Sequence, residues 1–205
     1  MLARKAAQLD GADTAVLDAW LTHIIITPLP LPNAPPLVLA RLTRDSAWAE
    51  MVFSVMVEGL EVQALDALIR QYVLPGRKRE HLPPRLLAGM LTGFMDLVLQ
   101  HDGRYYILDY KSNRLDGYAP AQMQHSILAH RYDVQYALYL LALHRLLKSR
   151  LPDYDYDVHV GGAVYLYLRG IDQPGAGIHV DRPPRAFIEA LDAAFSDKKF
   201  HPRLA

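Results

Sequence analysis

The sequence predicts an α/β domain, with three layers (α/β/α) around a central mixed sheet. Two apolar runs flank Asp102-Gly103, a dipeptide favoured in two-residue hairpin turns. Both faces of these runs carry apolar residues, which is typical of central strands covered on both sides. A long helical run then precedes another strand, and a strand-helix-strand unit places its strands in parallel with a right-handed crossover. The 205 residues, 51% of them hydrophobic, suffice for one such domain.

We expect residues 1–47 to form an N-terminal helix and a Pro-rich connector, and residues 48–205 to form the single globular domain. Apolar residues recur at helical spacing from Thr14 to Ile26. The five prolines between Pro28 and Pro36 require an extended, irregular segment. This part of the chain therefore leads into the domain.

The domain itself is expected to begin with a strand. The composition and periodicity of the remaining segments predict, in order, a strand at Trp48–Val55, a helix at Leu60–Tyr72, the hairpin within Gly93–Asn113, a helix at Ala121–Arg150, a strand at Gly161–Gly170, a loop at Asp172–Pro184 and a helix at Arg185–Phe195.

The turn at Asp102-Gly103 fixes the register of the hairpin. His101 then pairs with Arg104, and Asp96 falls opposite Asp109. Because side chains alternate faces along a strand, Lys111 shares the face of Asp109. The sequence therefore places two carboxylates and a lysine together on adjacent strands.

Two carboxylates that face each other across strands repel and need neutralisation. A hard divalent cation such as Mg²⁺ suits such a pair, and it would leave Lys111 available for chemistry. The alternative is an ordinary ion pair between Asp109 and Lys111 at the end of a strand. The opposed Asp96 favours the metal site.

Three further features are candidate parts of a site. Glu50 lies on the first strand, either facing solvent or turned toward the site. Gln135 and Tyr139 lie on one helical face, where a buried amide needs a hydrogen-bond partner; the alternative is that Gln135 caps a backbone group and Tyr139 is core. A basic segment before the hairpin is either a solvated loop or a phosphate contact, and includes Arg77, Lys78, Arg79 and Arg85.

Composition narrows the class of function. The net charge is zero, so any contact with nucleic acid must be local or shared with other subunits. The absence of cysteine excludes structural disulfides, Cys-held zinc and iron–sulfur clusters. The chain has no P-loop motif and hence no ATP site of that kind. It also lacks a membrane-length apolar run and a signal-peptide pattern, so we expect a cytoplasmic protein with no membrane partner.

The hairpin carries a family resemblance. The motifs G-F-M-D-L-V, Y-Y-I-L-D-Y-K-S-N and, twenty residues on, Q-Y-A-L-Y resemble the C-terminal nuclease domain of RecB, the β subunit of exodeoxyribonuclease V. That domain belongs to the PD-(D/E)XK nucleases. The likeness extends from about Trp48 to Phe195. It implies a restriction-endonuclease-like fold and hydrolysis of phosphodiester bonds in linear DNA.

The resemblance also implies roles for individual residues. Asp96, Asp109 and the main-chain carbonyl of Tyr110 match the ligands of Mg²⁺, for which Mn²⁺ substitutes. Lys111 matches the residue that orients or activates the attacking water. Gln135 and Tyr139 match the Q-x-x-x-Y motif that lines the site, and Glu50 matches an acidic position on the family's first strand. The implied partners are DNA, the helicase and other subunits of a RecBCD-type complex, and a RecA-type recombinase.

One departure from the family concerns a histidine upstream of the hairpin that supplies a further metal ligand. No matching segment precedes the hairpin here, which suggests a C-terminal fragment or a shortened relative. The rival hypothesis is therefore a catalytically incomplete interaction module that docks a recombinase or partner subunits. A third hypothesis is a structural domain with an internal ion pair.

Overall fold

A computed structural model describes residues 11–173 and 175–196. The chain divides into two compact units, residues 1–43 and 44–205. Within the described residues, no helix combines the length and the apolar character needed to cross a membrane.

The first unit contains the predicted N-terminal helix. This helix, α2, spans Gly11–Ile26, which confirms the prediction for Thr14–Ile26. The proline-rich segment that follows turns back on itself, because Leu29 and Leu37 exchange two backbone hydrogen bonds. A short 3-10 helix, η1, follows at Leu39–Arg41.

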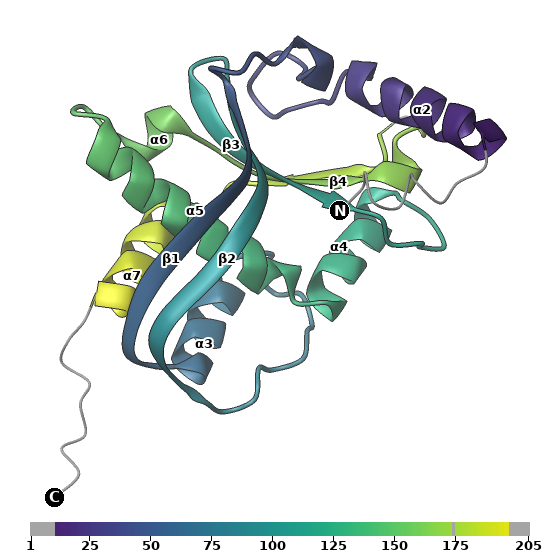
Figure 1. The fold of residues 1–205 in the computed structure, drawn as a ribbon. Coiled ribbons are helices and arrows are strands. Elements are labelled where there is room, and N and C mark those ends of the chain that lie inside the picture. Colours follow the sequence, from purple (N-terminus) through teal and green to yellow (C-terminus); the bar gives the residue numbers. More distant parts are fainter. Residues whose placement is uncertain (1–10, 174, 197–205) are drawn as a thin grey trace, which may run out of the picture. The chain divides into compact units, whose positions relative to one another are not determined.

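The second unit is built on a sheet that is mixed, as the sequence predicts, and that has five strands (Figure 1). Along the sheet the strands lie in the order β1-β2-β3-β4-β5. Only β3 and β4 are parallel; the other neighbours are antiparallel. The strands are β1 (Ala47–Glu61), β2 (Leu86–His101), β3 (Arg104–Lys111), β4 (Val160–Tyr167) and β5 (Ile178–Asp181).

The hairpin between β2 and β3 has the predicted register. His101 pairs with Arg104, and the ladder continues to the pair Leu97 and Leu108. Asp102 and Gly103 have φ angles of 49° and 74°, which match a type I′ turn with two left-handed residues. The turn therefore sets which side chains of the two strands share a face.

Helices cover one face of the sheet and form the main core with it. Side chains from α3, α5 and α7 pack there against inward-facing residues of four strands, and Ile69, Tyr136, Leu140 and Phe187 have no exposed surface. In Figure 1, α3 and α7 lie at the far end of the long β1-β2 pair. The helices of this unit are α3 (Val62–Tyr72), α4 (Pro120–Ala129), α5 (Tyr132–Arg150), α6 (Tyr156–His159) and α7 (Arg185–Ser196), with a 3-10 helix, η2, at Leu168–Gly170.

The helix predicted at Ala121–Arg150 is interrupted, so this prediction was wrong in its continuity. Arg131 adopts a left-handed backbone conformation with φ 54° and separates α4 from α5. Its guanidinium donates hydrogen bonds to Asp66, to Asp133 and to the main-chain carbonyl of Glu80. The contacts to Asp66 and Glu80 reach distant parts of the chain and offset the strain of the left-handed conformation. Helical periodicity in the sequence does not reveal such contacts.

The segment Asp172–Pro184, predicted as a loop, contains the edge strand β5. Its four residues pair with β4 from Ala163 to Leu166. The loop prediction rested on the Gly and Pro content of the segment, and Gly175 and Gly177 do adopt positive φ angles before the strand begins. A four-residue edge strand is too short to produce a clear alternating pattern.

A buried cluster of four charges fixes the start of α5. Asp133 accepts a hydrogen bond of 2.7 Å from Arg79 and one of 3.1 Å from Arg131, and Arg131 also pairs with Asp66 of α3 at 2.5 Å. The side chains of Arg79 and Asp133 are 1% and 0% exposed. Arg79 also donates to the carbonyls of Val73 and Leu74. The cluster thus ties α3, the basic segment and α5 together.

We predict that Asp133→Ala lowers the free energy of unfolding by about 3–5 kcal/mol, because it leaves the buried Arg79 charge without its carboxylate. Urea denaturation measures this change. The control is Lys148→Ala, which removes an exposed partner of Asp192 at 3.8 Å and should have a much smaller effect. Equal losses in the two variants would contradict the structural role of the cluster.

Candidate active site

The sheet divides at the point where the two predicted aspartates lie. The β2-β3 ladder ends at Leu97 and Leu108, whereas β3 continues beside β4 as far as Lys111. Asp96 is the next residue of β2 beyond the ladder, and its carboxylate accepts a hydrogen bond of 2.9 Å from the backbone N–H of Tyr110. The Asp96 side chain thus replaces a strand partner in the gap and stays close to the end of β3.

Asp109 and Lys111 form a buried ion pair in that region. The Lys111 Nζ lies 2.6 Å from Asp109 Oδ1, and the side chains are 9% and 5% exposed. Burial raises the pKa of Asp109 above its usual value, Lys111 opposes this shift, and the nearby charge of Asp96 adds to it. The ion pair expected from the alternative interpretation is therefore present, beside a second carboxylate that it does not neutralise.

Aromatic rings and an amide complete the surroundings of Lys111. Its Nζ lies 3.7 Å from the ring centre of Tyr132 and 4.8 Å from that of Tyr165. It also donates a hydrogen bond of 3.0 Å to Gln135 Oε1. Electron-rich ring faces attract an ammonium group, most strongly away from water. Residues of β3, α5 and β4 thereby hold Lys111 in one place.

Gln135 connects the lysine to Tyr139. Its Oε1 accepts hydrogen bonds from Lys111 and, at 2.9 Å, from the Tyr165 hydroxyl, while its Nε2 donates to the Tyr139 hydroxyl at 2.8 Å. Gln135 thus bonds three side chains instead of capping the backbone. Burial raises the pKa of Tyr139 to about 12, so its hydroxyl keeps its proton at neutral pH. Since that oxygen accepts from Gln135, its own hydrogen remains available to donate.

Gly93 makes room for the ring that supports Tyr139. A Cβ atom at Gly93 would lie 2.6 Å from two ring carbons of Phe53 on the neighbouring strand. Phe53 in turn packs edge to face on Tyr139, with 5.5 Å between ring centres. Gly93, the first residue of the G-F-M-D motif, therefore influences how the sheet packs on α5, the helix that carries Gln135.

Glu50 lies beside Asp96 on the neighbouring strand. Ala49 pairs with Leu97 and Met51 with Met95, which places Glu50 opposite Asp96 in register. Glu50 is exposed and has a φ angle of 53°, an uncommon backbone conformation for this residue type. Glu50 and Asp96 therefore occupy facing positions on β1 and β2, whereas the β2-β3 ladder ends before Asp109.

The basic segment is divided between two environments. Arg77, Lys78 and Arg85 are exposed. Arg79 is instead buried, and its guanidinium is occupied by Asp133 and two backbone carbonyls. The expectation of phosphate contact is therefore kept for the three exposed residues, and Arg79 has a structural role.

The donor set fits a divalent cation that is only partly held by protein. Among residues 11–173 and 175–196, no group of three or more His, Cys, Asp or Glu side chains converges as a metal site. The site offers two hard carboxylates, Asp96 and Asp109, whose charges interact. Such a set suits Mg²⁺, which is commonly held by one or two carboxylates with water and substrate phosphate.

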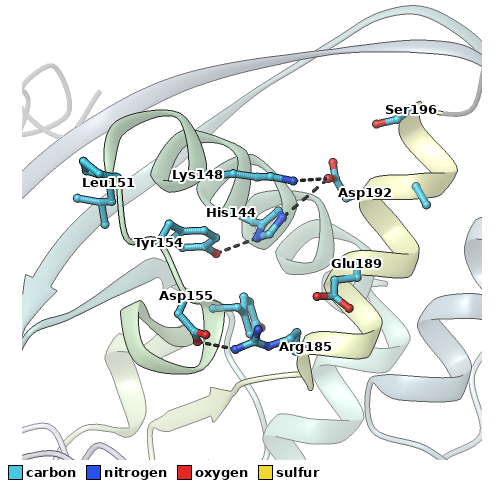
Figure 2. A pocket seen from close by; sticks show the side chains of 12 residues that line it. His144, Lys148, Leu151, Tyr154, Asp155, Arg185, Glu189, Asp192 and Ser196 are labelled. Atoms are coloured by element: carbon cyan, nitrogen blue, oxygen red, sulfur yellow. Dashed lines mark hydrogen bonds and ion pairs between the residues drawn. The ribbon is translucent and has the colours of Figure 1, made fainter.

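A separate cavity of about 520 Å³ lies between the end of α5, the segment that follows it, and α7. Figure 2 shows two sets of contacts in its wall: His144 and Lys148 reach Asp192, and Arg185 pairs with Asp155. These charges largely neutralise one another. None of the residues that line this cavity is a predicted site residue.

The chain matches the family model of the PD-(D/E)XK nuclease superfamily over residues 12–201. The chain belongs to this superfamily. Its members generally depend on a divalent metal, in agreement with the paired carboxylates of β2 and β3. The mixed five-stranded sheet with its helices is consistent with the α/β fold of this superfamily.

Several curated relatives are RecB proteins, subunits of the RecBCD enzyme. The chain is 41% identical to RecB of Escherichia coli K12 and 37% identical to that of Haemophilus influenzae, in each case over 94% of this chain. It is 30% identical to RecB of Mycolicibacterium smegmatis over 87% of this chain. These matches cover 17%, 16% and 20% of the respective relatives, so the chain corresponds to a small part of each.

Sequence reasoning missed two contributors to the site, Tyr132 and Tyr165. Tyr132 belongs to the helical face of Gln135 and Tyr139, three residues before Gln135, and this spacing was a usable signal. Tyr165 lies opposite Asp109 in the parallel β3-β4 ladder. Finding it requires the parallel register, which no local turn specifies.

We predict that Gly93→Ala lowers the free energy of unfolding by about 1–3 kcal/mol through overpacking against Phe53. Phe53→Leu removes the ring atoms that the new methyl group would meet. The double variant should therefore lose less than the sum of the single losses, as measured in a double-mutant cycle of urea denaturation. Strict additivity would contradict the proposed contact.

Proposed function

We propose that this chain is the nuclease part of a RecBCD-type complex and hydrolyses phosphodiester bonds of linear DNA with Mg²⁺. The observation that carries the proposal is the buried Asp109-Lys111 pair beside the unneutralised carboxylate of Asp96. A cation held by Asp96, Asp109 and the Tyr110 carbonyl would offset the repulsion between the two acids. Mn²⁺ is the expected substitute because it favours the same oxygen ligands.

When bound, the metal ion polarises the scissile phosphate and lowers the pKa of its bound water. Lys111 has a fixed position, and its ammonium offsets negative charge that develops on the phosphate oxygens. Gln135 orients Lys111 through Oε1 and Tyr139 through Nε2. The Tyr139 hydroxyl, protonated at neutral pH, donates toward the substrate. Glu50, in register with Asp96 on the neighbouring strand, is the acidic candidate for a further contact to metal or water.

We also propose macromolecular partners for this chain. The relatives named RecB are subunits of RecBCD enzymes, and we propose that this chain likewise works in DNA repair and recombination with a helicase and other subunits in the cytoplasm. The exposed Arg77, Lys78 and Arg85 would supply phosphate contacts that a neutral chain otherwise lacks. A RecA-type recombinase is the corresponding candidate for a protein partner.

The alternative, an interaction module without cleavage, does not require Asp109, Lys111 and Gln135 to meet. Their convergence favours the nuclease. A purely structural ion pair would account for Asp109 and Lys111 alone. It leaves the adjacent Asp96 carboxylate without a role beyond its single backbone hydrogen bond.

We predict that Asp109→Asn and Lys111→Met each reduce cleavage of linear single-stranded DNA about 100-fold or more, since each removes a charge from the reacting centre. Gel assays with Mg²⁺ or Mn²⁺ measure this loss. The control is Asp102→Asn in the hairpin turn, where asparagine also tolerates positive φ and cleavage should persist. A wild-type chain that cuts with neither metal, or a fully active Asp109→Asn, would contradict the proposal.

We predict that affinity for Mn²⁺ rises with pH through the pKa of Asp109. Metal ligands must be deprotonated, and burial raises the pKa of this carboxyl, so protons compete with the cation to a higher pH than at an exposed aspartate. Electron paramagnetic resonance of free Mn²⁺ between about pH 4.5 and pH 7 follows the change. Asp109→Asn should weaken binding and flatten this dependence; an unchanged profile would place the metal elsewhere.

A further inference from the structure

The strand β1 forms one edge of the sheet and pairs with β2 only (Figure 1). Residues 51–58 of β1 pair without a bulge, and the register shifts only beyond them, between Glu58 and Leu60. Among residues 11–173 and 175–196, no hydrogen bond joins the other side of β1 to a further element. About 27 Å of extended backbone therefore presents N–H and C=O groups that a further strand can bind.

This edge lacks the features that usually protect an edge strand from pairing with another chain. Natural edge strands commonly are very short, or carry lysine, proline or a bulge. The strand β1 has 15 residues with neither lysine nor proline, and its stretch 51–58 is regular. The opposite edge, β5, has only four residues. Of the two edges of the sheet, β1 is therefore the one that offers a long template for an added strand.

Exposed apolar side chains lie next to this edge, on the face of the β1-β2 pair opposite the main core. Val52 and Met56 of β1 are 57% and 50% exposed, and they pair with Phe94 and Met90 of β2, which are 61% and 60% exposed. The residues that alternate with Val52 and Met56 on β1 pack in or against the main core, so these two side chains share the outer face. A strand added beside β1 would place its own side chains next to them and cover part of this apolar surface.

The charge of the β1-β2 pair indicates the chemistry of such a strand. The two strands contain no lysine or arginine, and their acidic residues are Glu50, Glu58, Glu61 and Asp96. Glu58 is exposed and shares the outer face with Met56, two residues before it. Acidic strands repel a second copy, because two antiparallel β1 strands centred on Ser54 would set Glu50 of each copy opposite Glu58 of the other. They favour a strand with basic residues.

We propose that β1 binds an extended segment of a partner protein, which joins the sheet as a sixth strand. This segment carries two apolar residues four positions apart, beside Val52 and Met56, and a lysine or arginine beside Glu58. Strand addition of this kind gains affinity from main-chain hydrogen bonds and specificity from alternate side chains. None of these three β1 residues belongs to the candidate active site, so the proposal does not depend on the nuclease function.

The synthetic peptide K-T-V-T-T-T-V-T-K is a suitable probe, because its sequence is palindromic and places a lysine beside Glu58 in either strand direction. Backbone amide signals of the isotope-labelled chain, followed by NMR during titration with the peptide, should shift mainly within residues 51–58. Glu58→Lys should weaken binding about fivefold. The control is Asp153→Lys, which makes the same change of charge in an exposed turn after α5 and should stay within about twofold of the wild type.

Two N-methylated forms of the peptide test the backbone pairing itself. Methyl groups on the odd-numbered residues of one form and on the even-numbered residues of the other block opposite edges of the same strand. One form should bind like the parent peptide, and the other should bind at least about tenfold more weakly, because it loses several main-chain hydrogen bonds.

Four results would overturn the proposal: no binding by the wild type, shifts centred outside β1, equal affinity of the two methylated forms, or wild-type affinity in Glu58→Lys. Analytical ultracentrifugation of the chain alone tests the rival occupant. A dimer that Glu58→Lys strengthens, by pairing the new lysine with Glu50 of the other copy, would show that a second copy covers this edge and would also overturn the proposal.

Discussion

The burial of the Lys111 ammonium group is the constraint on which the rest of the candidate site depends. A charge with so little exposure is tolerated only when its neighbours replace the lost water. Asp109, Gln135 and the faces of two tyrosine rings do so, and they come from β3, α5 and β4. The need to satisfy one buried cation therefore determines how a helix and two strands are positioned around the carboxylates.

The surrounding scaffold keeps this arrangement in place from two sides. On the sheet, β2 leaves β3 at Leu97, and Asp96 fills the gap by accepting the Tyr110 N–H. On the helical side, the buried cluster of four charges around Arg131 and Asp133 fixes the first turn of α5, only a few residues before Gln135. Because Gly93 has no side chain, the Phe53 ring has room to pack edge to face on Tyr139. The side chains of the candidate site are thus held by strands and a helix instead of loops.

Local chemistry made the hairpin and its aspartates predictable from the sequence. Asp102-Gly103 specifies a turn whose register carries Asp96 and Asp109 to adjacent positions, and alternation assigns Lys111 to the same face. The roles of the aspartates as metal ligands remain predictions. The mixed sheet followed from the order of the elements, with its parallel pair between β3 and β4.

Other features depend on contacts between distant parts of the chain, so the sequence concealed them. The break at Arg131 is stabilised by Asp66, 65 positions earlier, and nothing in the helical pattern of residues 121–150 indicates it. Arg79 looked like its exposed basic neighbours until the structure paired it with Asp133. Tyr165 entered the site only through the parallel register. Glu50 lies on a strand, as predicted, but no local sequence signal indicates its left-handed backbone conformation.

The most direct test of the account is anomalous diffraction from crystals of the chain grown with Mn²⁺. We predict a peak at direct coordination distance, about 2.0–2.6 Å for hard divalent cations, from carboxylate oxygens of both Asp96 and Asp109, with Lys111 still paired to Asp109. A peak confined to the α5-α7 cavity, or none between the two aspartates at saturating Mn²⁺, would contradict it.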